Sequence, residues 1–120
     1  MKKFLWVAVA GLAVVLAGCS DSPKTVTEKW HDAIVSGDLE TANKYSTDSM
    51  QSVNKVNVGL FAKDDHSWGN KLIPGQAENF RNMKFGKEEI SGDIATVYFN
   101  DDKGQIQLRK VDGDWKVNMF

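Results

Sequence analysis

The sequence predicts an α+β fold in which helices come first and an antiparallel sheet of about four strands comes last. Apolar residues recur at helical spacing between positions 23 and 61, which indicates three helices. Between positions 83 and 119 apolar and polar residues alternate instead, which is typical of strands. Because the helices precede the strands as a block, we expect them to pack on an antiparallel meander.

The first 18 residues have the layout of a secretory signal peptide: two lysines, an apolar run over 4–16, and small residues before the cleavage point. The run is shorter than the about 20 apolar residues that a membrane-spanning helix needs. It ends in Leu16-Ala17-Gly18-Cys19, which resembles the bacterial lipobox. This resemblance implies that the signal is removed before Cys19 and that Cys19 is acylated. The alternatives are an uncleaved anchor and an ordinary secreted protein.

Cys19 is the only cysteine, so we expect neither a disulfide nor a thiolate metal site in the exported chain. Two or more acyl chains form a stable membrane anchor. The lipobox resemblance, with Ser20 after the cysteine, implies a lipid-anchored envelope protein on the periplasmic face of the outer membrane. Residues 19–22 then form the lipidated cysteine and a short tether, and residues 23–120 form one α+β domain. The three residues after Cys19 reach roughly 10–11 Å, which keeps the domain close to the membrane.

The composition argues against nucleic-acid binding. The chain has 15 basic and 16 acidic residues, and loss of the two signal-peptide lysines leaves a net charge of −3. The remaining 102 of the 120 residues are enough for one small domain with a hydrophobic core. A mildly acidic surface without a basic run is poorly suited to nucleic acid.

Each predicted helix has a start or stop signal. Ser22-Pro23 combines an N-cap serine with proline at the first helical position, and Gly37 is a typical stop. Asp38 can cap a second helix, and Thr47 or Asp48 a third. The expected apolar faces are Val26, Trp30, Ala33 and Ile34, then Leu39, Ala42 and Tyr45, then Met50, Val53, Val56 or Asn57, Leu60 and Phe61.

The sheet follows an irregular segment over 62–77 that is polar and rich in turn residues. Gly86 is a candidate β-bulge in the first strand, and Asp112-Gly113 is a two-residue hairpin turn before the last. The residues expected on the apolar face are Met83, Phe85, Ile90, Ile106, Leu108, Trp115, Val117 and Met119, besides the β-branched and aromatic run Ile94–Phe99.

Several of these segments together resemble a known group of small bacterial lipoproteins that carry a domain of unknown function. They are Ser22-Pro23, an aromatic-bearing helix ending at Ser36-Gly37-Asp38, a second helix reaching Lys44-Tyr45, and the closing strands Asp93-Ile94-Ala95-Thr96-Val97 and Val111-Asp112-Gly113-Asp114-Trp115-Lys116-Val117. Such domains are similar to the nuclear-transport-factor-2-like cone, in which helices pack into a curved antiparallel sheet. The resemblance implies a fold and no particular activity.

A cone of this kind has a natural pocket between its two layers. The wider superfamily includes isomerases and hydrolases that use a pocket carboxylate with tyrosine or histidine. Glu88 is the one carboxylate whose strand position can face inward, and an exposed edge charge is its alternative role. The candidate pocket-lining residues are Trp30, Tyr45, Phe61, Glu88, Phe99 and Trp115, and the aromatic ones among them are equally suited to the core.

No catalytic residue, cofactor site or metal site is predicted. The histidines, His31 and His66, lie far apart, and Asp64-Asp65-His66 offers metal-ligand types without further ligands. Trp68 stands in a polar segment where no core pattern requires it, so Trp68 and His66 are candidate surface contacts.

These observations predict a non-enzymatic binding or interaction module, held to the membrane by the lipid on Cys19 and contacting an envelope protein. The alternative is a small-ligand carrier, or an isomerase- or hydrolase-like enzyme, that uses the interior pocket of the cone.

Overall fold

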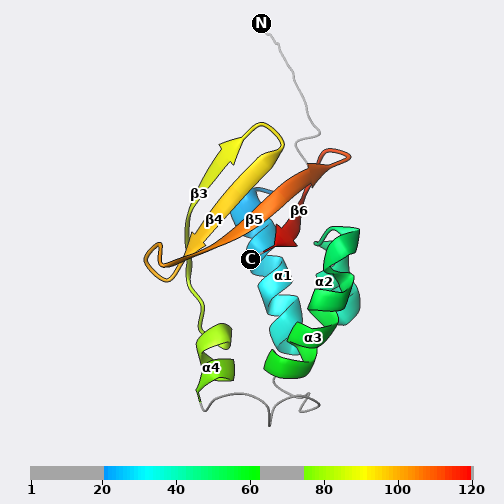
Figure 1. Cartoon of the computed structure of the whole chain (residues 1–120), viewed down its shortest axis with the longest axis vertical. Coiled ribbons are helices and arrows are strands. Elements are labelled where there is room, and N and C mark those ends of the chain that lie inside the picture. Colours follow the sequence, from blue (N-terminus) through cyan, green and yellow to red (C-terminus); the bar gives the residue numbers. More distant parts are fainter. Residues whose placement is uncertain (1–20, 63–74, 120) are drawn as a thin grey trace, which may run out of the picture.

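The computed structural model describes residues 21–62 and 75–119, and Figure 1 shows their α+β arrangement. The helices are α1 (Pro23–Ser36), α2 (Leu39–Lys44), the 3-10 helix η1 (Asp48–Met50), α3 (Gln51–Phe61) and α4 (Gln76–Arg81). They precede β3 (Phe85–Ser91), β4 (Ile94–Phe99), β5 (Gly104–Val111) and β6 (Asp114–Met119). The strands form one antiparallel sheet in the order β3-β4-β5-β6, which confirms the predicted fold class. Within the two described ranges, no helix is both long enough and apolar enough to cross a membrane.

The ends of α1 and α2 confirm the predicted capping signals. The Ser22 side chain accepts a hydrogen bond from the backbone N–H of Thr25, and Pro23 occupies the first turn. Gly37 ends α1 with φ of 81°, a left-handed conformation that favours glycine. Asp38 then caps α2 by accepting from the N–H of Thr41.

The buried face of α3 differs from the predicted one in part. Val53 is 38% exposed, and Asn54, which was not predicted there, is buried. Of the two alternatives Val56 and Asn57, Asn57 is the buried one and Val56 is 44% exposed. Asn54 is turned inward because Trp30 Nε1 donates to its Oδ1 at 2.8 Å. Hydrogen bonds at both Oδ1 and Nδ2 allow the Asn54 amide to be buried, so α3 turns Asn54 inward in place of Val53.

The short helix α4 is a second difference, because the sequence pattern predicts an irregular segment up to residue 77 and a strand after it. Six residues are too few for a periodic signal, and an isolated helix of this length is unstable in water. Tertiary contacts stabilise it instead. Phe80 stacks on Phe61 with ring centroids 4.2 Å apart, and Arg81 Nε donates to the Phe61 carbonyl at 3.0 Å.

The sheet has a bulge and a hairpin turn where the sequence predicts them. The register of β3 against β4 shifts between Phe85 and Glu88, which confirms the bulge at Gly86. Asp112 and Gly113 both have positive φ, of 52° and 87°, as a two-residue turn between antiparallel strands requires.

One predicted core residue of the sheet is wrong. Ile90 lies opposite Ala95 on the face that the helices cover, yet 55% of it is exposed. The reason is that α1 begins at Pro23, level with Glu88, so the helix layer stops before it reaches Ile90. The core lies further along the sheet, and its fully or nearly fully buried members include Trp30, Ile34, Val97, Ile106, Leu108 and Val117.

Candidate functional site

Side chains occupy the space between the helices and the sheet in the described part of the chain. Trp30, Val97 and Leu108 have no exposed surface, so Trp30 is a core residue and does not line an open pocket. Among residues 21–62 and 75–119, the buried polar residues are Thr27, His31, Ser46, Asn54 and Asn57, and no carboxylate is among them. The open hollows of the described residues therefore lie at the surface.

One surface pocket, of about 160 Å³, brings together two of the aromatic residues that the sequence predicted as pocket-lining, Tyr45 and Trp115. Its lining residues come from the start of α1, the end of α2 and the start of β6. We call it the Tyr45 pocket. Its lining residues are Asp21, Val26, Lys44, Tyr45, Asp114, Trp115 and Lys116.

Backbone hydrogen bonds between α2 and β6 hold Tyr45 in place. Tyr45 ends α2, and its carbonyl accepts from the N–H of Val117 at 2.8 Å. Thr47 N–H returns a bond to the Val117 carbonyl at 2.9 Å. Lys116 Nζ donates to the Lys44 carbonyl at 2.6 Å, which closes one wall. Segments some 70 residues apart in sequence thus form a single rigid rim.

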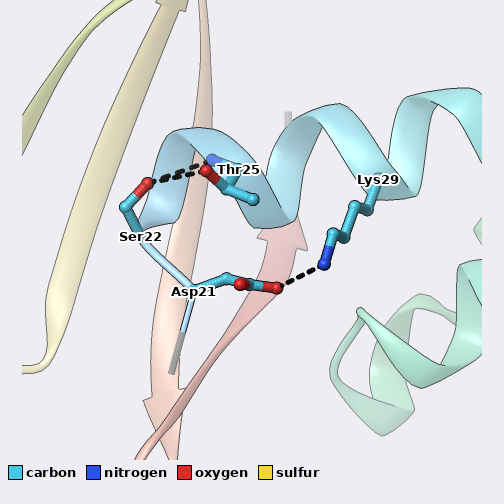
Figure 2. A network of polar contacts seen from close by, with 4 residues as sticks. All are labelled: Asp21, Ser22, Thr25 and Lys29. Carbon is cyan, nitrogen blue, oxygen red and sulfur yellow. Dashed lines mark hydrogen bonds and ion pairs between the residues drawn. The ribbon is translucent and has the colours of Figure 1, made fainter. Parts of the chain in front are cut away.

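Two lysine side chains lie close to the Tyr45 ring. Lys29 Nζ and Lys44 Nζ lie 5.8 and 5.5 Å from its centroid. Lys29 is also paired with Asp21 at 2.8 Å, beside the Ser22–Thr25 capping contacts (Figure 2). That hydrogen bond, reinforced by the negative charge of Asp21, raises the pKa of Lys29, so the side chain stays protonated at neutral pH. Lys29 is therefore paired with Asp21, and the charged residues that remain in the pocket wall are two lysines, Lys44 and Lys116, and one carboxylate, Asp114.

Glu88 does not take part in this pocket. It is half-buried, and its Oε1 accepts from the backbone N–H of Lys24 at 2.8 Å. A carboxylate at this place stabilises the unpaired N–H groups and the positive end of the dipole of α1. No sequence pattern predicts this role, because Lys24 and Glu88 are 64 residues apart.

The remaining predicted aromatics, Phe61 and Phe99, belong to a cluster at the other end of α1. The His31 ring lies 4.9 Å from Phe80 and 5.3 Å from Phe85, and Phe85 lies 6.2 Å from Phe99. His31 is only 5% exposed, and its Nε2 lies 2.7 Å from the Phe80 carbonyl, to which it can only donate. This bond makes His31 an anchor for α4.

Tyr98 has a polar environment that the sequence pattern did not single out. Its hydroxyl donates to Glu89 Oε1 at 2.6 Å, and Lys87 Nζ lies 4.7 Å from the ring centroid. These residues lie at the surface, beside an open hollow that Tyr98 lines together with Lys84, Phe85, Gly86 and the loop 100–103. Strand alternation places Tyr98 on the face away from the helices, which is the one signal that could have indicated an exposed tyrosine.

We expect the Tyr98 hydroxyl to ionise at a higher pH than a free tyrosine. The hydrogen bond to Glu89 raises its pKa above the usual value of 10.0, because ionisation breaks the bond and puts two negative charges together. The stability that this bond contributes is present below pH 10 and is lost as the pH rises through the folded-state pKa. Tyrosinate absorbance in a Tyr45→Phe background, which leaves Tyr98 as the sole tyrosine, measures the pKa. Glu89→Gln should lower it, and an unchanged titration would contradict the assignment.

Some predicted residues lie outside the described ranges. They are Cys19, Asp64, Asp65, His66 and Trp68. Within residues 21–62 and 75–119, no group of three potential metal ligands is close enough to hold an ion.

Comparison with known proteins gives a family and a fold likeness. The family model described as a domain of unknown function, DUF4878, matches residues 17–118. A crystal structure at 2.00 Å of a candidate NTF2-like transpeptidase from Campylobacter jejuni is 14% identical, with a TM-score of 0.49. The alignment covers 83% of this chain and 100% of that one. No curated protein matches the sequence.

Proposed function

The chain belongs to the DUF4878 family, a domain of unknown function, and we propose that it is a membrane-anchored binding module of the bacterial cell envelope. Acyl chains on Cys19 hold it to the membrane. It contacts an envelope protein through the Tyr45 pocket, and the group that enters the pocket is small and anionic. The observation that carries the binding site is the convergence of Tyr45 and Trp115 with lysines on one rim.

The size of the pocket supports a contact of this kind. About 160 Å³ is less than the roughly 300–1,000 Å³ of pockets that enclose a whole small-molecule ligand. It suffices for one side chain or a chain terminus. Lysine is a compact point charge on a flexible stem, so Lys44 and Lys116 suit the carboxylate of an acidic side chain or of a C-terminus.

The packed core favours a surface site over the alternative. A ligand carrier, or an isomerase- or hydrolase-like enzyme, would use the space between helices and sheet. In the described residues that space holds Trp30, Ile34 and Leu108, each completely buried. A surface contact needs no such space.

The anchor is tested by the mass and location of the mature chain. We expect the full-length protein to fractionate with membranes, and its N-terminal peptide to carry the mass of acyl chains on Cys19. Cys19→Ser removes the acylated thiol, so the N-terminal peptide of this variant should carry no acyl mass. A membrane-bound chain with an unmodified Cys19 would contradict the proposal.

The pocket is tested with acetate as the probe, by NMR titration of the detergent-solubilised full chain. Amide shifts should concentrate at Tyr45, Trp115 and Lys116. Lys44→Glu reverses a charge in the wall and should weaken binding at least about tenfold, or ~1.4 kcal/mol. Lys87→Glu is the matched control, since Lys87 also lies over a tyrosine, Tyr98, but outside the pocket.

An equal loss in both variants would mean that acetate responds only to total charge. Shifts scattered over the surface in the unmodified chain would likewise exclude the Tyr45 pocket as the contact site.

A further inference from the structure

The described chain begins at the end of the molecule that carries the β3–β4 turn and the β5–β6 turn. Lys24 N–H bonds to Glu88, four residues before the turn at 92–93. Asp21 lines the same pocket as Asp114, directly after the turn at 112–113. Figure 1 shows both turns on the side of the molecule where α1 starts, with α4 at the opposite end.

Three of the five exposed large apolar residues of the described chain gather at this end. Ile90, Ile94 and Val111 are 55%, 36% and 37% exposed. Each lies within three residues of one of the two turns. The other two, Val53 and Val56, are on α3. We call Ile90, Ile94, Val111 and the two turns the turn edge.

The strand register places these apolar residues on both faces of the sheet. Ile90 is opposite Ala95 and therefore shares the face that the helices cover. Ile94 and Val111 lie on the other face of the sheet, away from the helices, because neighbouring residues of a strand point to opposite sides. The turn edge thus presents apolar side chains around the end of the sheet. This arrangement suits contact with a soft, extended surface better than stacking with a helix or another sheet.

The charges of the turn edge are nearly balanced. Arg109 and Lys110 carry positive charge close to the turns, and Asp93 and Asp112 carry negative charge on them. A basic surface would select anionic lipids, whereas a balanced one suits headgroups that carry both signs.

We propose that the turn edge is the surface on which the domain rests against the lipid bilayer. This inference depends on the proposed acylation of Cys19. From Cys19, the three residues 20–22 reach roughly 10–11 Å, so an acylated chain keeps the start of α1 at the headgroups. Ile90, Ile94 and Val111 then enter the interface, where burial of apolar surface is favourable. The opposite end of the domain, with α4, faces away from the membrane. The Tyr45 pocket includes Asp21 and Asp114, next to the turn edge, so the proposed protein partner would reach it at the membrane surface.

The test uses the acylated full chain in vesicles of zwitterionic phosphatidylcholine. Cys19 is the only cysteine, and its thiol is blocked by acylation, so one introduced cysteine carries a polarity-sensitive dye. Reporters are Ile94→Cys and Val111→Cys, one near each turn, and Val56→Cys on α3 is the matched control, since it is also an exposed apolar residue. We expect emission at shorter wavelength, and strong quenching by lipids with nitroxide-labelled chains, at both reporters and not at the control.

The outcomes separate this inference from the proposed function. A mature chain without acyl mass overturns the anchor, and with it the orientation. An acylated chain whose two reporters remain unquenched overturns the orientation alone. A shift in emission without lipid quenching would assign the turn edge to a protein contact or a second copy, and equal quenching at Val56→Cys would show that no edge is preferred. Melting curves of each labelled variant confirm that the domain is folded. If one of the two reporter variants does not fold, the other still tests the orientation.

Discussion

Replacing Trp30 with alanine is expected to lower the free energy of unfolding by about 3–5 kcal/mol. Trp30 has no exposed surface, and its ring lies edge-on to Phe80 with centroids 6.3 Å apart. The change leaves a large cavity in the core and deprives the buried Asn54 Oδ1 of its indole donor. Domains of this size have a total stability of about 5–15 kcal/mol, so the variant should be close to unfolding at ambient temperature.

Urea denaturation followed by circular dichroism measures this loss without relying on tryptophan fluorescence. Trp30→Phe is the informative partner variant, because it keeps much of the apolar volume and removes the N–H group. It should fall between the two chains in stability. A Trp30→Ala variant that unfolds within about 1 kcal/mol of the original would exclude Trp30 as the centre of the core.

Two buried asparagines on α3 should respond differently to the same substitution. Asn54→Leu is expected to lower the free energy of unfolding by about 2–4 kcal/mol, because it leaves three buried or half-buried partners without their hydrogen bonds. Asn54 Oδ1 accepts from Trp30, and its Nδ2 donates to Asn43 Oδ1 and Ser46 Oγ, both at 3.0 Å. These bonds join α1 and α2 to α3, so their loss loosens the whole helical layer.

Asn57→Leu serves as the matched variant, one turn further along α3. In the described residues its buried Nδ2 has no hydrogen-bond partner, so leucine removes a desolvated polar group. We expect a change of less than about 1 kcal/mol, of either sign. Denaturation of the two variants under identical conditions gives the comparison. Equal losses would show that volume, and not the hydrogen-bond network, determines the cost at both positions.

The sequence predicted those parts of the fold that depend on neighbouring residues. Ser22-Pro23, Gly37 and Asp38 determine where α1 starts and ends and where α2 starts, through bonds that span at most five residues. Asp112-Gly113 likewise determines the last hairpin. Such signals are readable because the atoms involved are close in sequence, whatever the rest of the chain does.

Its errors concern residues whose environment is distant in sequence. The rotation of α3 depends on Trp30, which lies 24 residues before Asn54. The helix α4 depends on Phe61 and His31, and the exposure of Ile90 depends on where α1 begins. A prediction from hydrophobic periodicity assumes that one whole face of each helix or strand is covered by apolar neighbours. The assumption does not hold for α3, where Asn54 joins a polar network, or for Ile90, which the helices do not reach.

By itself, then, the sequence determined the order of helices and strands, most of their boundaries, the α+β class and the candidate anchor at Cys19. Only the tertiary structure decided that Tyr45 and Trp115 meet in one pocket while Trp30 is core and Glu88 supports the start of α1. Helix capping and strand alternation depend on residues that are close together in the sequence. The position of a side chain between core, pocket and surface depends instead on which segments pack against it, and for Trp30 and the rim of the Tyr45 pocket those segments lie 24 and 72 residues away.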